Sequence, residues 1–121
     1  MPSIDKNAAL AACGMDHSAA LARFSGNENL LQTFLKEFPE EGYLRAVRRT
    51  RESGDAAAYQ AAVHTVKGTA GSLGLTKLYA ASAAMMEALR AGDDAKAEAL
   101  LPQVEEEYEK ACQAIRQAFS A

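Results

Sequence analysis

The spacing of apolar residues predicts helices along most of the chain. Apolar side chains recur three or four positions apart, which places them on one face of an α-helix, and no segment shows the alternation of a half-buried β-strand. We expect two short helices over residues 4–12 and 18–24, then four longer helices over about 27–53, 55–73, 75–90 and 94–119. Short polar or glycine-containing turns separate these helices.

Two prolines lie inside the predicted long helices. Proline removes a backbone donor, and its ring clashes with the carbonyl group one turn earlier. We therefore expect a kink at Pro39, assisted by Gly42, and a kink or local break at Pro102. Asn27 and Asp55 are suitable N-caps for the first and second long helices.

Four long helices joined by short loops pack as antiparallel neighbours. The pattern therefore predicts an all-α protein, an antiparallel up-down-up-down four-helix bundle with short N-terminal helical segments capping one end. We place the N-terminal short helices in residues 1–26 and the bundle in residues 27–121, as a single domain overall. The length agrees, because 121 residues can form one core of their own but are too few for two ordinary domains.

Composition and charge narrow the possible classes of function. Contents of 49% hydrophobic and 24% charged residues are typical of a folded globular protein. The net charge of −3 argues against nucleic acid as a partner. No apolar run approaches the roughly 18 residues of a membrane span, so we expect a cytoplasmic location and no membrane contact by this domain.

Several other polar features are interpreted as structural. Cys13 and Cys112 lie about a hundred residues apart without the spacing of zinc ligands, and we expect both to be buried packing residues. His17 is expected in an exposed loop, and the glutamates within residues 105–109 on the solvent side of the last helix. A cluster of arginines forms either a solvated face or a surface that steers an acidic partner; it consists of Arg45, Arg48, Arg49 and Arg51.

The most informative pattern lies between Tyr59 and Leu75. At about 100° per residue, one side of this helix is apolar. That side consists of Tyr59, Ala62, Val63, Val66, Ala70 and Leu73. His64 lies roughly opposite, which excludes a core role, and Gly74 after the stripe is typical of a helix C-cap. The outward side also contains Gln60, Ala61, Lys67, Gly68 and Gly71.

An outward histidine followed one turn later by a lysine is suited to accept a phosphoryl group. An imidazole nitrogen is nucleophilic near neutral pH, and a lysine can offset the charge of close to −2 that the phosphoryl group brings. Gly68 costs about 1 kcal/mol relative to alanine in a helix interior, and Gly71 adds to that cost. An unobstructed approach to His64 explains Gly68, whereas helix packing or a helix end also accounts for Gly71 and Gly74.

The segment from His64 to Leu75, H-T-V-K-G-T-A-G-S-L-G-L, resembles the signature of histidine-containing phosphotransfer (HPt) domains. That signature is His-x-x-Lys-Gly followed by a Leu-Gly pair. The wider chain is also similar to the family, in F-L-K-E-F-P at residues 34–39 and in the stretch from Met86-Glu87 to Gly92-Asp93. The resemblance extends over roughly residues 27–119.

The resemblance implies a role in multistep two-component phosphorelays. His64 would accept a phosphoryl group from the aspartyl phosphate of a receiver domain and pass it to a second receiver aspartate, while Lys67 would stabilise the phosphohistidine. The receiver would supply Mg²⁺ and most catalytic groups, so we expect a phosphocarrier without autonomous catalysis, metal site or cofactor. The residues expected to permit close approach and docking are Gly68, Gln60, Ala61 and Gly71.

The implied partners are response-regulator receiver domains, as donor and acceptor. A hybrid sensor histidine kinase in the same chain or in trans is a further partner, in which case the chain could belong to the cytoplasmic part of a larger membrane-bound kinase. One departure concerns the imidazole nitrogen that is not phosphorylated. Some family members hydrogen-bond it with a glutamine from the next helix, where this chain has Met86; Ser82, one turn earlier, is a possible substitute.

Other classes explain the sequence less well. A chemotaxis-kinase-type phosphotransfer domain shares the bundle and the motif but takes its phosphoryl group from a kinase domain. The dimerisation helices of a histidine kinase also carry an exposed histidine, yet Thr65 follows His64 and no ATP-binding glycine boxes are present. A non-catalytic binding bundle stays open as an alternative, and no acid, base and metal constellation indicates a hydrolase.

Overall fold

The computed structural model describes residues 6–120 as helices joined by short turns. In chain order these are α1 (Lys6–Ala12), α2 (His17–Arg23), α3 (Glu28–Glu37), the short 3-10 helix η1 (Phe38–Glu40), α4 (Tyr43–Ser53), α5 (Ala56–Ser72), α6 (Thr76–Arg90) and α7 (Asp94–Ala118). Residues 4 and 5, with which the first predicted helix begins, lie outside the described residues. Residues 6–120 contain no β-strand, and the all-α prediction is confirmed.

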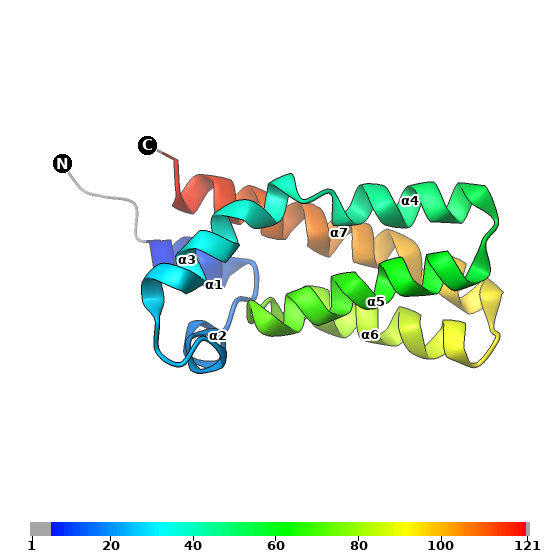
Figure 1. Ribbon diagram of the computed structural model, residues 1–121, viewed down its shortest axis with the longest axis horizontal. Helices are drawn as coiled ribbons and strands as arrows, with labels where there is room; N and C mark the ends of the chain where they lie inside the picture. The colour runs from blue at the N-terminus through cyan, green and yellow to red at the C-terminus, as the bar shows by residue number, and fades with distance from the viewer. Residues whose placement is uncertain (1–5, 121) are drawn as a thin grey trace.

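Helices α4 to α7 form the predicted antiparallel bundle (Figure 1). Helix α5 packs between α4 and α6, and α6 packs against α7. Helix α7 extends along the whole molecule, so that its C-terminal half contacts α1 and α3 (Figure 1). The N-terminal helices therefore extend one end of the bundle, as the sequence predicted.

The core joins all of these helices through buried apolar side chains. Each fully buried Val, Leu, Ile or Met stabilises the fold by roughly 1.5–3 kcal/mol relative to an exposed one. The largest of them are Phe38, Leu31, Leu35, Leu75, Leu78, Met85, Met86, Ile115, Val47, Val63, Val66 and Val104. Val63, Val66 and Ala70 of α5 confirm the predicted buried stripe, and they fix the rotation of α5 about its axis.

The first long helix of the prediction is divided into three parts, and its description as one kinked helix was wrong. Helix α3 ends at Glu37, Pro39 lies in η1, and α4 begins after Gly42. Gly42 adopts the left-handed conformation, with φ of +72°, which a helix interior does not permit. Phe38 is buried at this break, so the core stabilises the change of direction.

In α7 the local break expected at Pro102 does not occur, and the exposure expected for Glu107 is wrong. The helix continues through Pro102 without interruption from Asp94 to Ala118. Leu101 and Val104 are buried beside the proline, and their packing holds the backbone helical despite the missing donor. Glu107, expected on the solvent side, is only 9% exposed, and Gln103 Nε2 donates to its Oε2 at 3.1 Å.

The connection between α1 and α2 is fixed against the turn between α5 and α6. The Asp16 amide donates to the Gly74 carbonyl at 2.7 Å, and the Thr76 amide donates to the Gly14 carbonyl at 3.2 Å. Gly74 has a φ of +69°, and a Cβ atom there would lie 2.5 Å from the Asp16 carbonyl oxygen. The predicted C-cap glycine therefore also permits this close approach of two backbone segments.

His17 is not the exposed loop residue that the sequence suggested. It is the first residue of α2, half-buried, and its Nε2 lies 2.8 Å from Oε1 of Glu28 in α3.

Both cysteines are buried, as predicted, and burial raises the pKa of each thiol. In the arginine cluster, Arg48 and Arg51 form salt bridges with glutamates of α7, so part of this basic face binds the bundle itself.

Candidate functional site

Both ends of α5 are stabilised by caps, so the helix that carries the outward face begins and ends at defined residues. At the N-terminus, Asp55 Oδ1 accepts a hydrogen bond from the Ala58 amide at 3.1 Å. At the C-terminus, the Leu75 amide donates to the Ala70 carbonyl at 2.9 Å, and the Gly74 amide donates to the Gly71 carbonyl at 3.3 Å. This pair of bonds is a Schellman motif, which ends the helix at a defined residue.

The imidazole of His64 is exposed on this face and is surrounded by small side chains. Ala61 and Gly68, one turn before and one turn after it, are also exposed. A Cβ atom added at Gly68 would meet no heavy atom within 4 Å. Among the hydrogen bonds of residues 6–120, none involves the His64 ring. The nitrogen atoms are therefore open to an approaching molecule.

Lys67 and Gly71 are brought together by Tyr79, a residue that the sequence analysis did not single out. The Lys67 ammonium lies 5.9 Å from the centroid of the Tyr79 ring, within the range of a cation–π contact. A Cβ atom at Gly71 would lie 3.2 Å from two carbon atoms of the same ring. Gly71 is therefore explained by packing against Tyr79, and its assignment to docking has no support from this geometry.

The contact between Tyr79 and Gly71 could have been predicted from the sequence, because the two residues are equally far from the turn between α5 and α6. Gly71 and Tyr79 stand at equal distances before and after Leu75. In an antiparallel helical hairpin, positions equally far from the turn lie opposite each other, so a large residue at one requires a small one at the other. Applied to α5 and α6, this rule pairs Gly71 with Tyr79.

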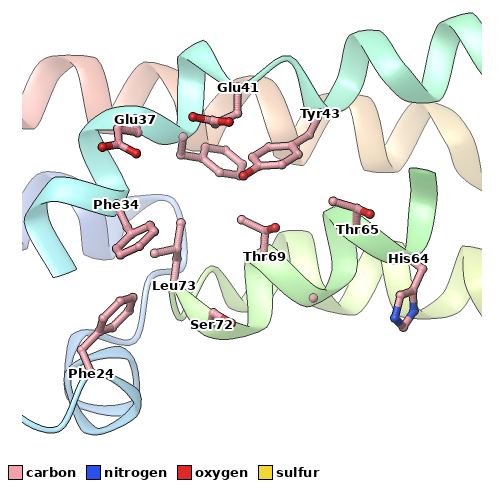
Figure 2. Close-up of a pocket in the computed structure, with 12 residues that line it drawn as sticks. Phe24, Phe34, Glu37, Glu41, Tyr43, His64, Thr65, Thr69, Ser72 and Leu73 are labelled. Carbon is pink, nitrogen blue, oxygen red and sulfur yellow. The ribbon is translucent and has the colours of Figure 1, made fainter. Parts of the chain in front are cut away.

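His64 lies at one end of a groove of about 660 Å³. Figure 2 shows Phe24 and Phe34 at the opposite end, with Thr65 and Thr69 of α5 facing Tyr43 across it. The groove lies between α5 and the segment from α2 to the start of α4. Its lining residues are Phe24, Phe34, Glu37, Phe38, Glu41, Tyr43, His64, Thr65, Gly68, Thr69, Ser72 and Leu73.

The groove combines aromatic side chains with an acidic edge. Four of its lining residues have aromatic rings, and Phe38 lies with its ring centroid 5.5 Å from that of Tyr43. Glu37 and Glu41 are exposed at the edge. In the described part of the chain, neither carboxylate forms a salt bridge or a hydrogen bond. Both negative charges are therefore available to a partner.

Three other residues of the predicted site lie elsewhere. Gln60 is half-buried and lines a separate hollow near the turn between α4 and α5, apart from the groove. Ser82 is fully buried, and its hydroxyl donates to the Leu78 carbonyl at 2.7 Å. Met86 is buried in the core. The suggested hydrogen bond from Ser82 to His64 is not formed, because the helix backbone accepts the hydroxyl proton.

Neither a metal-binding cluster nor a membrane-spanning helix is found within residues 6–120. No group of three or more histidine, cysteine, aspartate or glutamate side chains in this range is arranged to hold a metal ion. None of the helices in the same range has the length and apolar character needed to cross a bilayer.

The model of the Hpt domain family matches residues 29–118 of the chain. Comparison with curated proteins and with solved structures gives no match. Because the match includes well over half of the chain, the protein belongs to the Hpt domain family, the phosphocarrier modules of histidine phosphotransfer in two-component signalling. The family resemblance inferred from the sequence is confirmed, and it implies interaction with receiver domains and histidine kinases.

Proposed function

We propose that His64 is the phosphorylated residue of a phosphorelay intermediate. In this proposal, a lone pair on an imidazole nitrogen attacks the phosphorus atom of a receiver's aspartyl phosphate. An N–P bond forms while the P–O bond to the aspartate breaks, and the carboxylate leaves with the electron pair. A second receiver aspartate then attacks the phosphohistidine and regenerates the free imidazole.

The observation that carries the proposal is the exposure of His64 among small neighbours, at the end of a groove large enough to contact a partner. Phosphoryl transfer depends mainly on positioning and on neutralisation of charge. The receiver supplies Mg²⁺ and most of the other catalytic groups. The donor receiver belongs to a hybrid sensor kinase, in the same chain or in trans, and the exchange takes place in the cytoplasm.

Lys67 supplies the positive charge that this chain contributes. Its ammonium rests over the Tyr79 ring in the unphosphorylated protein. Positions three apart on a helix lie on the same face, about 5–6 Å apart at their Cβ atoms, so the flexible lysine chain can reach a phosphoryl group on His64. The cation–π contact is weak enough to be exchanged for the stronger attraction to a charge of close to −2.

The proposal is tested by incubation with receiver domains that carry radioactive phosphate on their aspartate. We expect acid-labile, base-resistant label on the wild-type chain and none on His64→Gln. The chain contains two histidines, so His17→Gln is the matched control and should retain the label. Label that persists in His64→Gln, or disappears only in His17→Gln, would refute the assignment.

A further inference from the structure

The Tyr79 ring and His64 lie on opposite sides of Lys67 along α5. The Lys67 ammonium lies 5.9 Å from the centroid of the ring. That ring packs against Gly71, one turn C-terminal to Lys67, whereas His64 lies nearly one turn N-terminal to it. At 1.5 Å per residue, Gly71 and His64 are about 10 Å apart along the helix axis. The ammonium must therefore leave the ring when it turns toward a group on the imidazole.

The ring of Tyr79 is held in place from two sides. A Cβ atom at Gly71 would lie 3.2 Å from Cδ1 and from Cε1 of the ring, so the glycine lets the ring lie close to the α5 backbone. In the first turn of α6, the Tyr79 amide donates to the Leu75 carbonyl at 2.8 Å. Tyr79 is nevertheless 42% exposed, which leaves room beside it for the lysine side chain.

The contact with Tyr79 is an interaction that Lys67 gives up on phosphorylation. Lys67 is half-buried, and within residues 6–120 its ammonium forms no salt bridge. A cation beside an aromatic ring is attracted by the quadrupole of the ring. This attraction stabilises the chain while His64 is unphosphorylated, and it is lost when the ammonium moves to a phosphoryl group.

We propose that Tyr79 is a positioning residue that competes with the phosphoryl group for Lys67. The proposal rests on the transfer function proposed for His64. In the exchange, the N–P bond of phosphohistidine forms while the P–O bond of the receiver's aspartyl phosphate breaks. The equilibrium therefore depends on the free energies of the chain with and without the phosphoryl group. The ring stabilises only the form without it, so Tyr79 shifts the equilibrium toward the phosphorylated receiver and favours onward transfer.

The test is the equilibrium constant for phosphoryl exchange with a receiver domain whose own aspartyl phosphate hydrolyses slowly. It is measured from both directions, with the receiver labelled by acetyl phosphate or the chain labelled by phosphoramidate, which transfers its phosphoryl group to histidine with loss of ammonia. Tyr79→Leu keeps apolar bulk against Gly71 but removes the ring, and should shift the equilibrium about two- to fivefold toward phosphohistidine. Tyr79→Phe keeps the ring and should stay close to the wild-type value.

The equilibrium constant separates positioning from docking and from general packing. A change in how the receiver docks alters the forward and reverse rates equally, and a loss of stability common to both forms of the chain cancels. In a Lys67→Met background, Tyr79→Leu should have no further effect, because the competing cation is absent. Lys77→Met is the matched control, since Lys77 is an exposed lysine of α6 whose stem packs over Gly14. It should leave the response to Tyr79→Leu unchanged.

Three results would overturn the role of Tyr79 and leave that of His64 intact. The first is an equilibrium constant that Tyr79→Leu does not change, or changes equally in the Lys67→Met background. The second is a shift toward the phosphorylated receiver, which would mean that the ring holds the lysine ready for the phosphoryl group. The third is a Tyr79→Phe protein that behaves like Tyr79→Leu, which would assign the effect to the hydroxyl. Phosphoramidate label that survives His64→Gln would instead refute the transfer function itself.

Discussion

The two glycines inside α5 should respond differently to the same substitution. Glycine in a helix interior is about 1 kcal/mol less favourable than alanine. A Cβ atom at Gly68 meets nothing within 4 Å, so Gly68→Ala should raise the free energy of unfolding by about 1 kcal/mol. For a chain of this length, that change corresponds to an increase in Tm of about 3–6 °C.

At Gly71 the gain should be largely cancelled. The new Cβ atom would lie 3.2 Å from the Tyr79 ring, which must move by a few tenths of an ångström. Tyr79 is 42% exposed and can rotate away, but the rotation removes its contact with the Lys67 ammonium. A cation–π contact at an exposed site is worth about 0.5–1 kcal/mol. The net gain for Gly71→Ala is therefore about 0–0.5 kcal/mol.

Urea unfolding followed by circular dichroism measures both effects. A double-mutant cycle isolates the contribution of the ring: in a Tyr79→Ala background, Gly71→Ala should recover the gain of about 1 kcal/mol seen at Gly68. If Gly71→Ala stabilises the wild-type background as much as Gly68→Ala does, the packing explanation of Gly71 is wrong.

A larger substitution at Gly68 tests whether a partner needs the glycine in order to reach His64. Gly68→Gln should retain most of the added helix stability yet slow transfer from a phosphorylated receiver, because its side chain occupies the open space beside the imidazole. Ala57→Gln, at an exposed position of the first turn of α5 and outside the groove, is the control and should transfer normally. Normal transfer by a stabilised Gly68→Gln protein would refute the argument.

Further predictions concern charge, backbone strain and pH. Lys67→Ala should keep the fold but slow transfer or shorten the phosphohistidine lifetime, and unchanged label decay would remove Lys67 from the mechanism. Gly74→Ala should lower the free energy of unfolding by more than about 2 kcal/mol in urea, since φ is +69° and the new Cβ would lie 2.5 Å from the Asp16 carbonyl; a loss below about 1 kcal/mol would contradict this. Burial raises the pKa of Cys112 from 9.0 to about 11 and that of Tyr108 from 10.0 to about 12. The protonated forms are favoured in the folded state, so this stability is fully present below pH 9 and is lost as the pH rises toward 12. A urea midpoint that does not change between neutral pH and about pH 11 would refute that prediction.

The two helix prolines show where prediction from sequence ended. Local rules gave the same expectation for Pro39 and Pro102, yet the helix ends near one and continues through the other. At Pro39, Gly42 allows a left-handed residue and Phe38 gains a buried position in the new direction. At Pro102, Leu101 before it and Val104 after it are buried, and the helix continues. Tertiary packing decides between these outcomes, and periodicity does not report it.

The site was predicted as far as one helix could determine it. The periodicity of α5 gave the exposure of His64 and the buried stripe, because both depend only on the angle about one axis. The ring of Tyr79 over Gly71 and the wall formed by Phe24 depend on contacts between separate segments. The burial of Ser82 and Glu107 likewise follows from how α6 and α7 face their neighbours. These contacts could be recognised only from the three-dimensional structure, because they depend on how separate helices pack.

The break between α3 and α4 gives the two sides of the groove separate structural supports. Residues 37–43 and Phe24 form the outer wall of the groove, whereas His64 is held by the packing of α5 against α4 and α6. Substitutions in the wall can therefore accumulate without moving the nucleophile. The shape and charge of the groove can therefore change while the position and exposure of the residue that we propose to be phosphorylated stay the same.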